Sequence, residues 1–206
     1  MAEERFAQRA AKQRDAAMLR SLLTCFNEHG CFETTLDQVA SDVGVGKGTL
    51  YRHYTSRDDL FEAALRAGIE ALLLRCRSIW ETHAADSDAG FRAVIDDLVA
   101  LNLRGDPLSP ATLSRLRCSC RWLNRSQPDK GEFEIALTPL VRDWQAAGLF
   151  DQATDASWIA AVTGALVNSL ATTGPDGQEP VAGRLVEILR RAFAPAPQSI
   201  IAVVGR

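Results

Sequence analysis

The sequence predicts an all-α protein with an N-terminal helix-turn-helix domain of three helices, followed by a bundle of roughly six helices. Apolar residues recur at spacings of three and four along most of the chain, which is the period of an amphipathic helix. Glycine and proline turns separate these segments, and the sequence has no strand-rich segment and no internal repeat. With 206 residues and 47% hydrophobic composition, the chain can form one sizeable core or two smaller ones.

The first two helices are predicted from their apolar positions and end signals. The first runs from about Phe6 to His29, and Gly30 follows it where a C-terminal cap belongs. A short second helix has Thr34 or Thr35 as its N-cap, and Asp37 or Gln38 stands near the reciprocal capping position. Gly44 ends this second helix, whose apolar residues are Leu36, Val39, Ala40 and Val43.

A third helix is predicted to begin near Gly46 or Lys47. Two short helices joined by a tight turn are typical of a helix-turn-helix, whose second helix enters the major groove of DNA. Gly48 has no side chain, so the backbone can approach a surface there, and no acidic residue lies between positions 45 and 57. The residues expected to contact DNA are Thr34, Thr35, Gly46, Lys47, Gly48, Thr49, Tyr51, Arg52, His53 and Arg57.

The distribution of charge agrees with specific binding of DNA. The formal net charge is -3, which does not favour bulk electrostatic binding of nucleic acid. A local basic region on an acidic protein favours specific over indiscriminate binding. The segment 5–20 has one acid, Asp15, against five cations: Arg5, Arg9, Lys12, Arg14 and Arg20. This segment either follows the adjacent phosphates or minor groove, or is a solvated arm, and the sequence leaves both interpretations open.

Several motifs extend beyond the helix-turn-helix. They are Phe26-Asn27-Glu28-His29-Gly30, Thr34-Thr35, Val45-Gly46-Lys47-Gly48-Thr49-Leu50-Tyr51, Tyr54, and Ser56-Arg57-Asp58-Asp59-Leu60. With these motifs, residues 10–65 closely resemble the DNA-binding domain of TetR-family transcriptional regulators. Two positions depart from the family pattern. Gly46 stands where the family usually has a serine that caps the recognition helix and touches a phosphate, and Tyr54 stands where it usually has phenylalanine.

The remaining helices are predicted to form the C-terminal domain. The fourth begins at Arg57 after an N-cap at Ser56, with Asp59 completing a capping box, and continues to about His83. After a loop at 84–90, helices are expected at about 91–103, 110–124, 132–147, 154–173 and 180–193. The 110–124 helix has Ser109 as its N-cap and Pro110 at its first position. The domain boundaries are therefore set at 1–56 and 57–206.

The family resemblance implies that the C-terminal helices bind a ligand. The aromatic residues proposed to line an effector pocket are Trp80, Phe91, Trp122 and Trp144, although for each one alone the pattern favours plain core. Polar groups such as Asn102, Arg121 or Asn124 could join them. No catalytic motif, cofactor motif or metal cluster stands out, so we expect no enzymatic activity, no cofactor and a small, apolar or aromatic organic effector.

The resemblance also implies a homodimer formed by the last two helices. Small residues at Ala161, Gly164, Ala165 and Asn168 would let another helix approach closely, and Leu185, Ile188 and Leu189 form an apolar stripe. Both faces could instead be buried within one chain. A two-fold dimer would read a palindromic operator. Effector binding would then move the fourth helix and change the spacing of the recognition helices; repression is implied by the resemblance alone.

The five cysteines include the pair Cys118 and Cys120, which supports an alternative in which thiol oxidation controls DNA binding. An odd number of cysteines does not suggest a disulfide framework. No signal peptide or apolar segment long enough to span a bilayer is visible, so a cytoplasmic location is expected. The tail at 194–206 is expected to be either disordered or extended.

Overall fold

A computed structural model describes residues 18–28, 35–44, 46, 48, 54, 56–119, 132–170 and 181–195. All regular structure in these ranges is helical, which confirms the predicted all-α class. No helix among them is both long and apolar enough to cross a membrane. Besides helical residues 18–28, the helices are α2 (Leu36–Val43), α4 (Arg57–Thr82), α5 (Ser87–Leu103), α6 (Pro110–Ser119), α7 (Glu132–Ala146), α8 (Ala156–Leu170) and α9 (Val181–Ala192).

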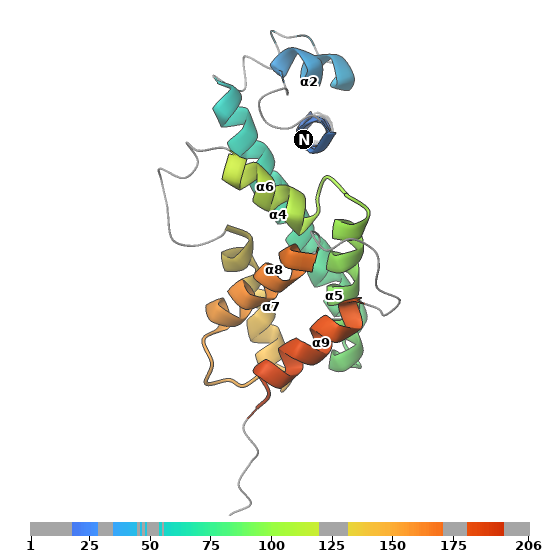
Figure 1. Cartoon of the computed structure of the whole chain (residues 1–206), viewed down its shortest axis with the longest axis vertical. Helices are drawn as coiled ribbons and strands as arrows, with labels where there is room; N and C mark the ends of the chain where they lie inside the picture. The colour runs from blue at the N-terminus through green and yellow to red at the C-terminus, as the bar shows by residue number, and fades with distance from the viewer. Residues whose placement is uncertain are drawn as a thin grey trace, which may run out of the picture.

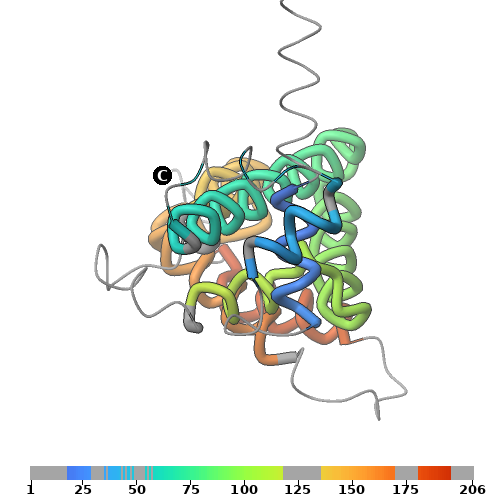
Figure 2. The backbone as a smooth tube through the Cα atoms, turned by 90° about the horizontal axis from the view of Figure 1, so that it is seen from above, coloured from blue at the N-terminus to red at the C-terminus, as the bar shows by residue number. Residues whose placement is uncertain are grey.

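The helices form two parts that α4 connects. Helical residues 18–28 and α2 lie at one end of the molecule, and α4 extends from that end into the bundle made by α5 to α9 (Figure 1). Seen along the long axis, these two N-terminal segments lie over the other helices (Figure 2). The arrangement places the predicted helix-turn-helix at the tip and the predicted ligand-binding helices below it.

Local capping sequences set three helix starts where they were predicted. Thr35 caps α2 and Ser56 caps α4, each in a reciprocal capping box with the residue three positions on. The Ser109 hydroxyl oxygen accepts a hydrogen bond from the Thr112 amide, and Pro110 is the first residue of α6. Gly44 ends α2 with φ of 70°, a left-handed conformation that glycine adopts without strain.

Helix α5 begins four residues earlier than predicted. The Asp86 carboxylate caps it by accepting a hydrogen bond from the Ala89 amide. The sequence prediction placed Gly90 in a loop, but Gly90 is buried inside the helix. A Cβ at this position would lie 2.9 Å from Cε3 of Trp80, so glycine lets α5 approach the Trp80 ring of α4. The glycine therefore serves helix packing here and does not end a helix.

One continuous hydrophobic core joins both parts of the molecule. At the N-terminal end, Phe26 and Phe61 pack edge to face with ring centroids 6.4 Å apart. Deeper in the bundle, the Arg75 guanidinium on α4 makes a bidentate ion pair with Asp97 on α5, with both N–O distances 2.6 Å. Helix α4 therefore contributes contacts at both ends of the molecule.

Candidate nucleic-acid interface and ligand hollows

The scaffold of the helix-turn-helix is fixed by hydrogen bonds and by apolar packing. Leu22, Phe26 and Val39 are buried together and hold α2 against helical residues 18–28. The Cys25 thiol also donates to the Asp42 carboxylate at 3.1 Å. Burial, followed by the hydrogen bond to Asp42, raises the pKa of Cys25 to about 11. Cys25 is therefore a neutral thiol at physiological pH and joins the two helices as a hydrogen-bond donor.

The structure describes only part of the predicted DNA-contacting surface. Thr35, Gly46 and Gly48 are exposed, and Arg57 is the first residue of α4. The Thr35 hydroxyl oxygen accepts from the Gln38 amide at 3.2 Å, so this residue also caps α2. Of the other predicted contacts, Thr34, Lys47, Thr49, Tyr51, Arg52 and His53 lie outside the described residues.

Asn27 connects the helix-turn-helix end to the bundle through its side-chain amide. Its Nδ2 donates to the Gly105 carbonyl at 2.9 Å, and its Oδ1 accepts from the Thr112 hydroxyl at 3.1 Å. The Arg115 guanidinium also donates to Asn27 Oδ1. We call these three hydrogen bonds the Asn27 contact. They tie the first helix of the N-terminal end to the α5–α6 turn and to α6.

Gly68 on α4 marks the apolar part of the same junction. A Cβ at this position would lie 2.7 Å from Leu113 Cδ2 and 3.3 Å from Leu23 Cδ1. The missing side chain thus lets α6 and helical residues 18–28 pack closely against α4. Three helices meet here, so the packing at Gly68 and the Asn27 contact together determine how the two ends of the molecule are oriented.

The predicted effector-pocket aromatics occupy different surroundings. Phe91 and Trp144 are both fully buried and stack edge to face with centroids 5.0 Å apart. Phe150 completes the cluster, with its centroid 5.3 Å from that of Phe91. Trp80 is partly buried beside Gly90, and Trp122 lies outside the described residues. Trp80, Phe91 and Trp144 are not among the described residues that line the two hollows below.

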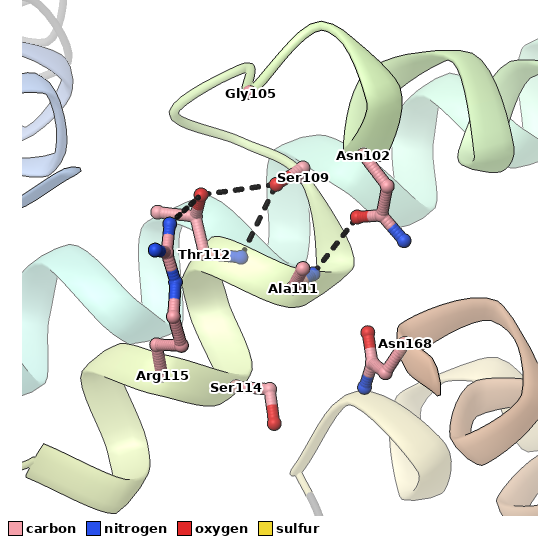
Figure 3. A pocket seen from close by; sticks show the side chains of 8 residues that line it. All are labelled: Asn102, Gly105, Ser109, Ala111, Thr112, Ser114, Arg115 and Asn168. Carbon is pink, nitrogen blue, oxygen red and sulfur yellow. Dashed lines mark hydrogen bonds between the residues drawn. The ribbon is translucent and has the colours of Figure 1, made fainter. Parts of the chain in front are cut away.

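The first hollow, which we call the α6 hollow, has a volume of about 390 Å³, and six of its eight described lining residues have polar side chains (Figure 3). It lies between the end of α5, the α5–α6 turn, α6 and α8. Its lining residues are Asn102, Gly105, Ser109, Ala111, Thr112, Ser114, Arg115 and Asn168. Asn102 was named from the sequence as a candidate polar group. Asn168 was predicted for the dimer interface, and nothing in the sequence indicated that it would meet α6.

The second hollow, the α4–α7 hollow, has a volume of about 270 Å³ and is lined mainly by apolar side chains. Its residues are Glu70, Leu73, Leu74, Arg77, Ala136, Pro139 and Leu140. Leu74 is 63% exposed, so the hollow continues into an apolar surface. The Arg77 guanidinium lies 3.5 Å from the Asp143 carboxylate at its edge, which joins α4 to α7.

The residues predicted for the dimer interface divide into buried and exposed groups. Leu185 and Leu189 are 2% and 0% exposed in their own chain, where they belong to the core. Ile188 is 51% exposed and Ala165 is also exposed. Trp158, which was not predicted at this surface, is 61% exposed on α8. The sequence pattern could not separate the two groups because both faces of α8 and α9 contain apolar residues.

Two of the five cysteines have described side chains, Cys25 and Cys76. Burial raises the pKa of Cys76 to about 12, so this thiol is also neutral. The side chains of Cys118 and Cys120 lie outside the described set. Among the residues that the structure describes, no group of three His, Cys, Asp or Glu side chains is placed to hold a metal ion.

Comparison with known proteins agrees with this architecture. Residues 19–64 match the model of bacterial regulatory proteins of the tetR family. An HTH-type transcriptional regulator of Staphylococcus aureus is 26% identical over 61 residues. That match covers 30% of this chain and 33% of the relative, so the chain aligns with about a third of the length of this curated protein.

Solved structures share the fold over nearly the whole chain. A TetR-family transcriptional regulator of Mesorhizobium loti has a TM-score of 0.63 at 19% identity, covering 89% of this chain and 98% of its own. RolR in complex with resorcinol has a TM-score of 0.56 at 16% identity, covering 91% of each chain. A ketosteroid transcriptional regulator of Mycobacterium tuberculosis has a TM-score of 0.52 at 16% identity, covering 89% and 96%.

The sequence match is confined to the helix-turn-helix end, and the fold match extends over the bundle. The resemblance predicted from the motifs is therefore confirmed: residues 19–64 match the tetR family of bacterial regulatory proteins, and the chain has the fold of solved TetR-family regulators.

Proposed function

We propose that this protein binds a palindromic DNA operator as a homodimer, represses transcription there, and is released by a small organic effector. The observation that carries the proposal is the helix-turn-helix scaffold, which is capped at Thr35 and Gly44 and packed onto α4. Such a scaffold is the part of a helix-turn-helix from which a recognition helix enters the major groove. The proposed site of action is the cytoplasm, where operator DNA is accessible.

The proposed DNA contacts are the ten residues predicted from the sequence. The exposed backbone at Gly46 and Gly48 supports them, because a helix start without side chains can approach phosphates closely. Lys47 is proposed to contact a phosphate and Tyr51 to donate a hydrogen bond from its hydroxyl group. The proposed domain boundary stays between residues 56 and 57, although Leu60 and Phe61 of α4 pack into the N-terminal part of the core.

The dimer is proposed to form through the exposed face of α8 together with Ile188 of α9. Trp158, Ala161, Val162 and Ala165 recur at helical spacing, and each is at least partly exposed. An exposed tryptophan on a surface of small residues is typical of an interface, because a partner helix can approach closely around it. Leu185 and Leu189 support this face from beneath, since they hold α9 against the core.

The effector is proposed to bind within the bundle. Two structural neighbours support a small organic molecule, since one was solved with resorcinol and the other is described as a ketosteroid regulator. The predicted pocket aromatics Phe91 and Trp144 would reach such a ligand only if the bundle opened, because both side chains are fully buried. Among the described residues, the two hollows are open to a ligand without such movement.

Selection of bound sequences from a random duplex library at near-physiological salt tests the proposed DNA binding. A recovered palindrome with two half-sites about one helical turn apart would support it. Lys47→Ala should weaken binding to the recovered site by about 1–3 kcal/mol, whereas Arg142→Ala on the exposed face of α7 is the matched control and should not. Recovery of no motif, with binding that disappears as the salt concentration rises, would refute sequence-specific regulation.

A further inference from the structure

The α6 hollow contains several polar groups that already have partners. Asn102 donates from Nδ2 to the Val167 carbonyl at 2.8 Å and accepts at Oδ1 from the Ala111 amide at 2.9 Å. Ser109 donates to the Thr112 hydroxyl oxygen at 3.0 Å and accepts from the Thr112 amide. Asn102 thus joins α5, α6 and α8, and these groups form a rigid polar wall.

Asn168 is different, because its Oδ1 atom is buried and has no hydrogen-bond partner in the structure. Its side chain and that of Ser114 face the same open space between α8 and α6 (Figure 3). A buried acceptor without a donor is unfavourable, and native proteins rarely leave one. The hollow of about 390 Å³ next to it is large enough for an organic molecule that supplies the missing donor.

The charges around the hollow favour an uncharged ligand. Among the described residues that line it, Arg115 is the charged one and none is acidic. The Arg115 guanidinium points away from Asn168 toward Thr112 and donates to Asn27 Oδ1 (Figure 3). An ammonium group would therefore find no counter-charge among the described lining residues. An anion could pair with Arg115 only by breaking the Asn27 contact. A hydroxyl group satisfies Asn168 without either cost.

We propose that the α6 hollow binds a small uncharged molecule with a hydroxyl group, which donates a hydrogen bond to Asn168 Oδ1. This proposal rests on the proposed function, because it identifies the hollow as the effector site. The position of the hollow gives the ligand a route to the DNA-binding end. Gly105, Thr112 and Arg115 line the hollow and are also the residues that hold Asn27.

The test uses the full-length protein without DNA and three pairs of probes. Phenol, benzyl alcohol and 2-naphthol are each compared with their methyl ethers, which keep the shape and lose the donor. Dissociation constants are measured by titration calorimetry or ligand-observed NMR. At least one hydroxyl compound should bind about tenfold more tightly than its ether, as expected when a buried acceptor gains or lacks its donor.

Variants locate this preference on Asn168. Asn168→Leu should abolish the difference between alcohol and ether, whereas Asn168→Asp, which keeps acceptor oxygens, should retain it. Ser169→Ala changes the exposed neighbour on the same helix and is the control. Ser114→Leu should block the hollow and weaken both members of a pair. Because this variant does not alter Asn168, it tests the site even if Asn168→Leu unfolds.

The proposal is overturned if no hydroxyl compound binds, if alcohols and ethers bind equally, or if Asn168→Leu keeps the preference while folded. Its failure can be distinguished from failure of the proposed function. Hydroxyl-selective binding without a recovered palindrome would support the proposed ligand site and refute operator binding. A recovered palindrome without hydroxyl-selective binding would support operator binding and refute the assignment of the effector site to this hollow.

Discussion

The Asn27 contact should make a measurable contribution to the stability of the whole chain. Asn27→Ala removes the donor to the Gly105 carbonyl and the acceptor for Thr112 and Arg115. The Thr112 hydroxyl can turn to the Asp106 carbonyl, which lies 3.2 Å away, and Arg115 can reach water because it is exposed. The variant therefore leaves few buried groups unsatisfied, and its cost comes mainly from the three lost bonds.

The expected loss follows from the usual net value of a hydrogen bond. At about 0.5–1.5 kcal/mol each, and with replacement partners for two of the three, the total is about 1–3 kcal/mol. A loss of about 2 kcal/mol corresponds to a decrease in Tm of about 4–8 °C for a chain of this length. Unfolding by heat and by urea, followed by circular dichroism, measures both values.

Asn27→Asp is the matched variant. A carboxylate still accepts hydrogen bonds from Thr112 and Arg115, and its charge strengthens the bond from Arg115. It cannot donate to the Gly105 carbonyl. It should therefore lose less stability than Asn27→Ala. The reasoning fails if Asn27→Ala costs less than about 0.5 kcal/mol, or if the aspartate variant is as unstable as the alanine variant.

Three further predictions concern packing, assembly and DNA contact. Gly68→Ala should lower the free energy of unfolding by about 1 kcal/mol, because overpacking against the buried Leu113 side chain, whose Cδ2 would lie 2.7 Å from the new Cβ, costs about 1–3 kcal/mol and the higher helix propensity of alanine returns about 1 kcal/mol. An unchanged urea midpoint would show that Leu113 moves aside at no net cost. Trp158→Arg should shift the protein from dimer to monomer in sedimentation at micromolar concentration, whereas the exposed Leu74→Arg should not; two equally dimeric variants would place the interface elsewhere. Lys47→Ala should reduce the salt slope of operator binding by about one unit, and an unchanged slope would show that Lys47 contacts no phosphate.

The helix starts could be predicted from the sequence because capping is local. Ser56 with Asp59, and Ser109 with Pro110, lie within a few residues of one another, so the sequence alone shows both partners. Gly90 was misinterpreted for the opposite reason. Its role depends on the Trp80 ring, which belongs to another helix, and no local pattern distinguishes a packing glycine from a glycine that ends a helix.

The site was harder to predict because it depends on how the helices are rotated against one another. The aromatic residues Phe91 and Trp144 were chosen by type, yet the bundle turns both into the core. Asn168 was assigned to a dimer face from its spacing along α8, and only the position of α6 makes it line the same hollow as Ser114. The spacing of side chains shows which residues share one face of a helix. It does not show which other helix packs against that face, because this depends on the tertiary structure.

The Asn27 contact sets a limit on the allosteric effect that it can transmit. Through these three bonds, a ligand can change the free-energy difference between two orientations of the DNA-binding end by no more than the bonds contribute, which is about 1–3 kcal/mol. That range corresponds to a change of about 5- to 150-fold in DNA affinity, which is the size of coupling commonly found between two sites. A larger response to effector would require the packing around Gly68 to change as well, because the ends of Leu23 and Leu113 would have to move past α4. The change in DNA affinity on adding effector should therefore be measured for the original chain and for Asn27→Ala. The ratio of the two changes gives the part of the coupling that the hydrogen bonds transmit, and the change that remains in Asn27→Ala is the part transmitted by packing.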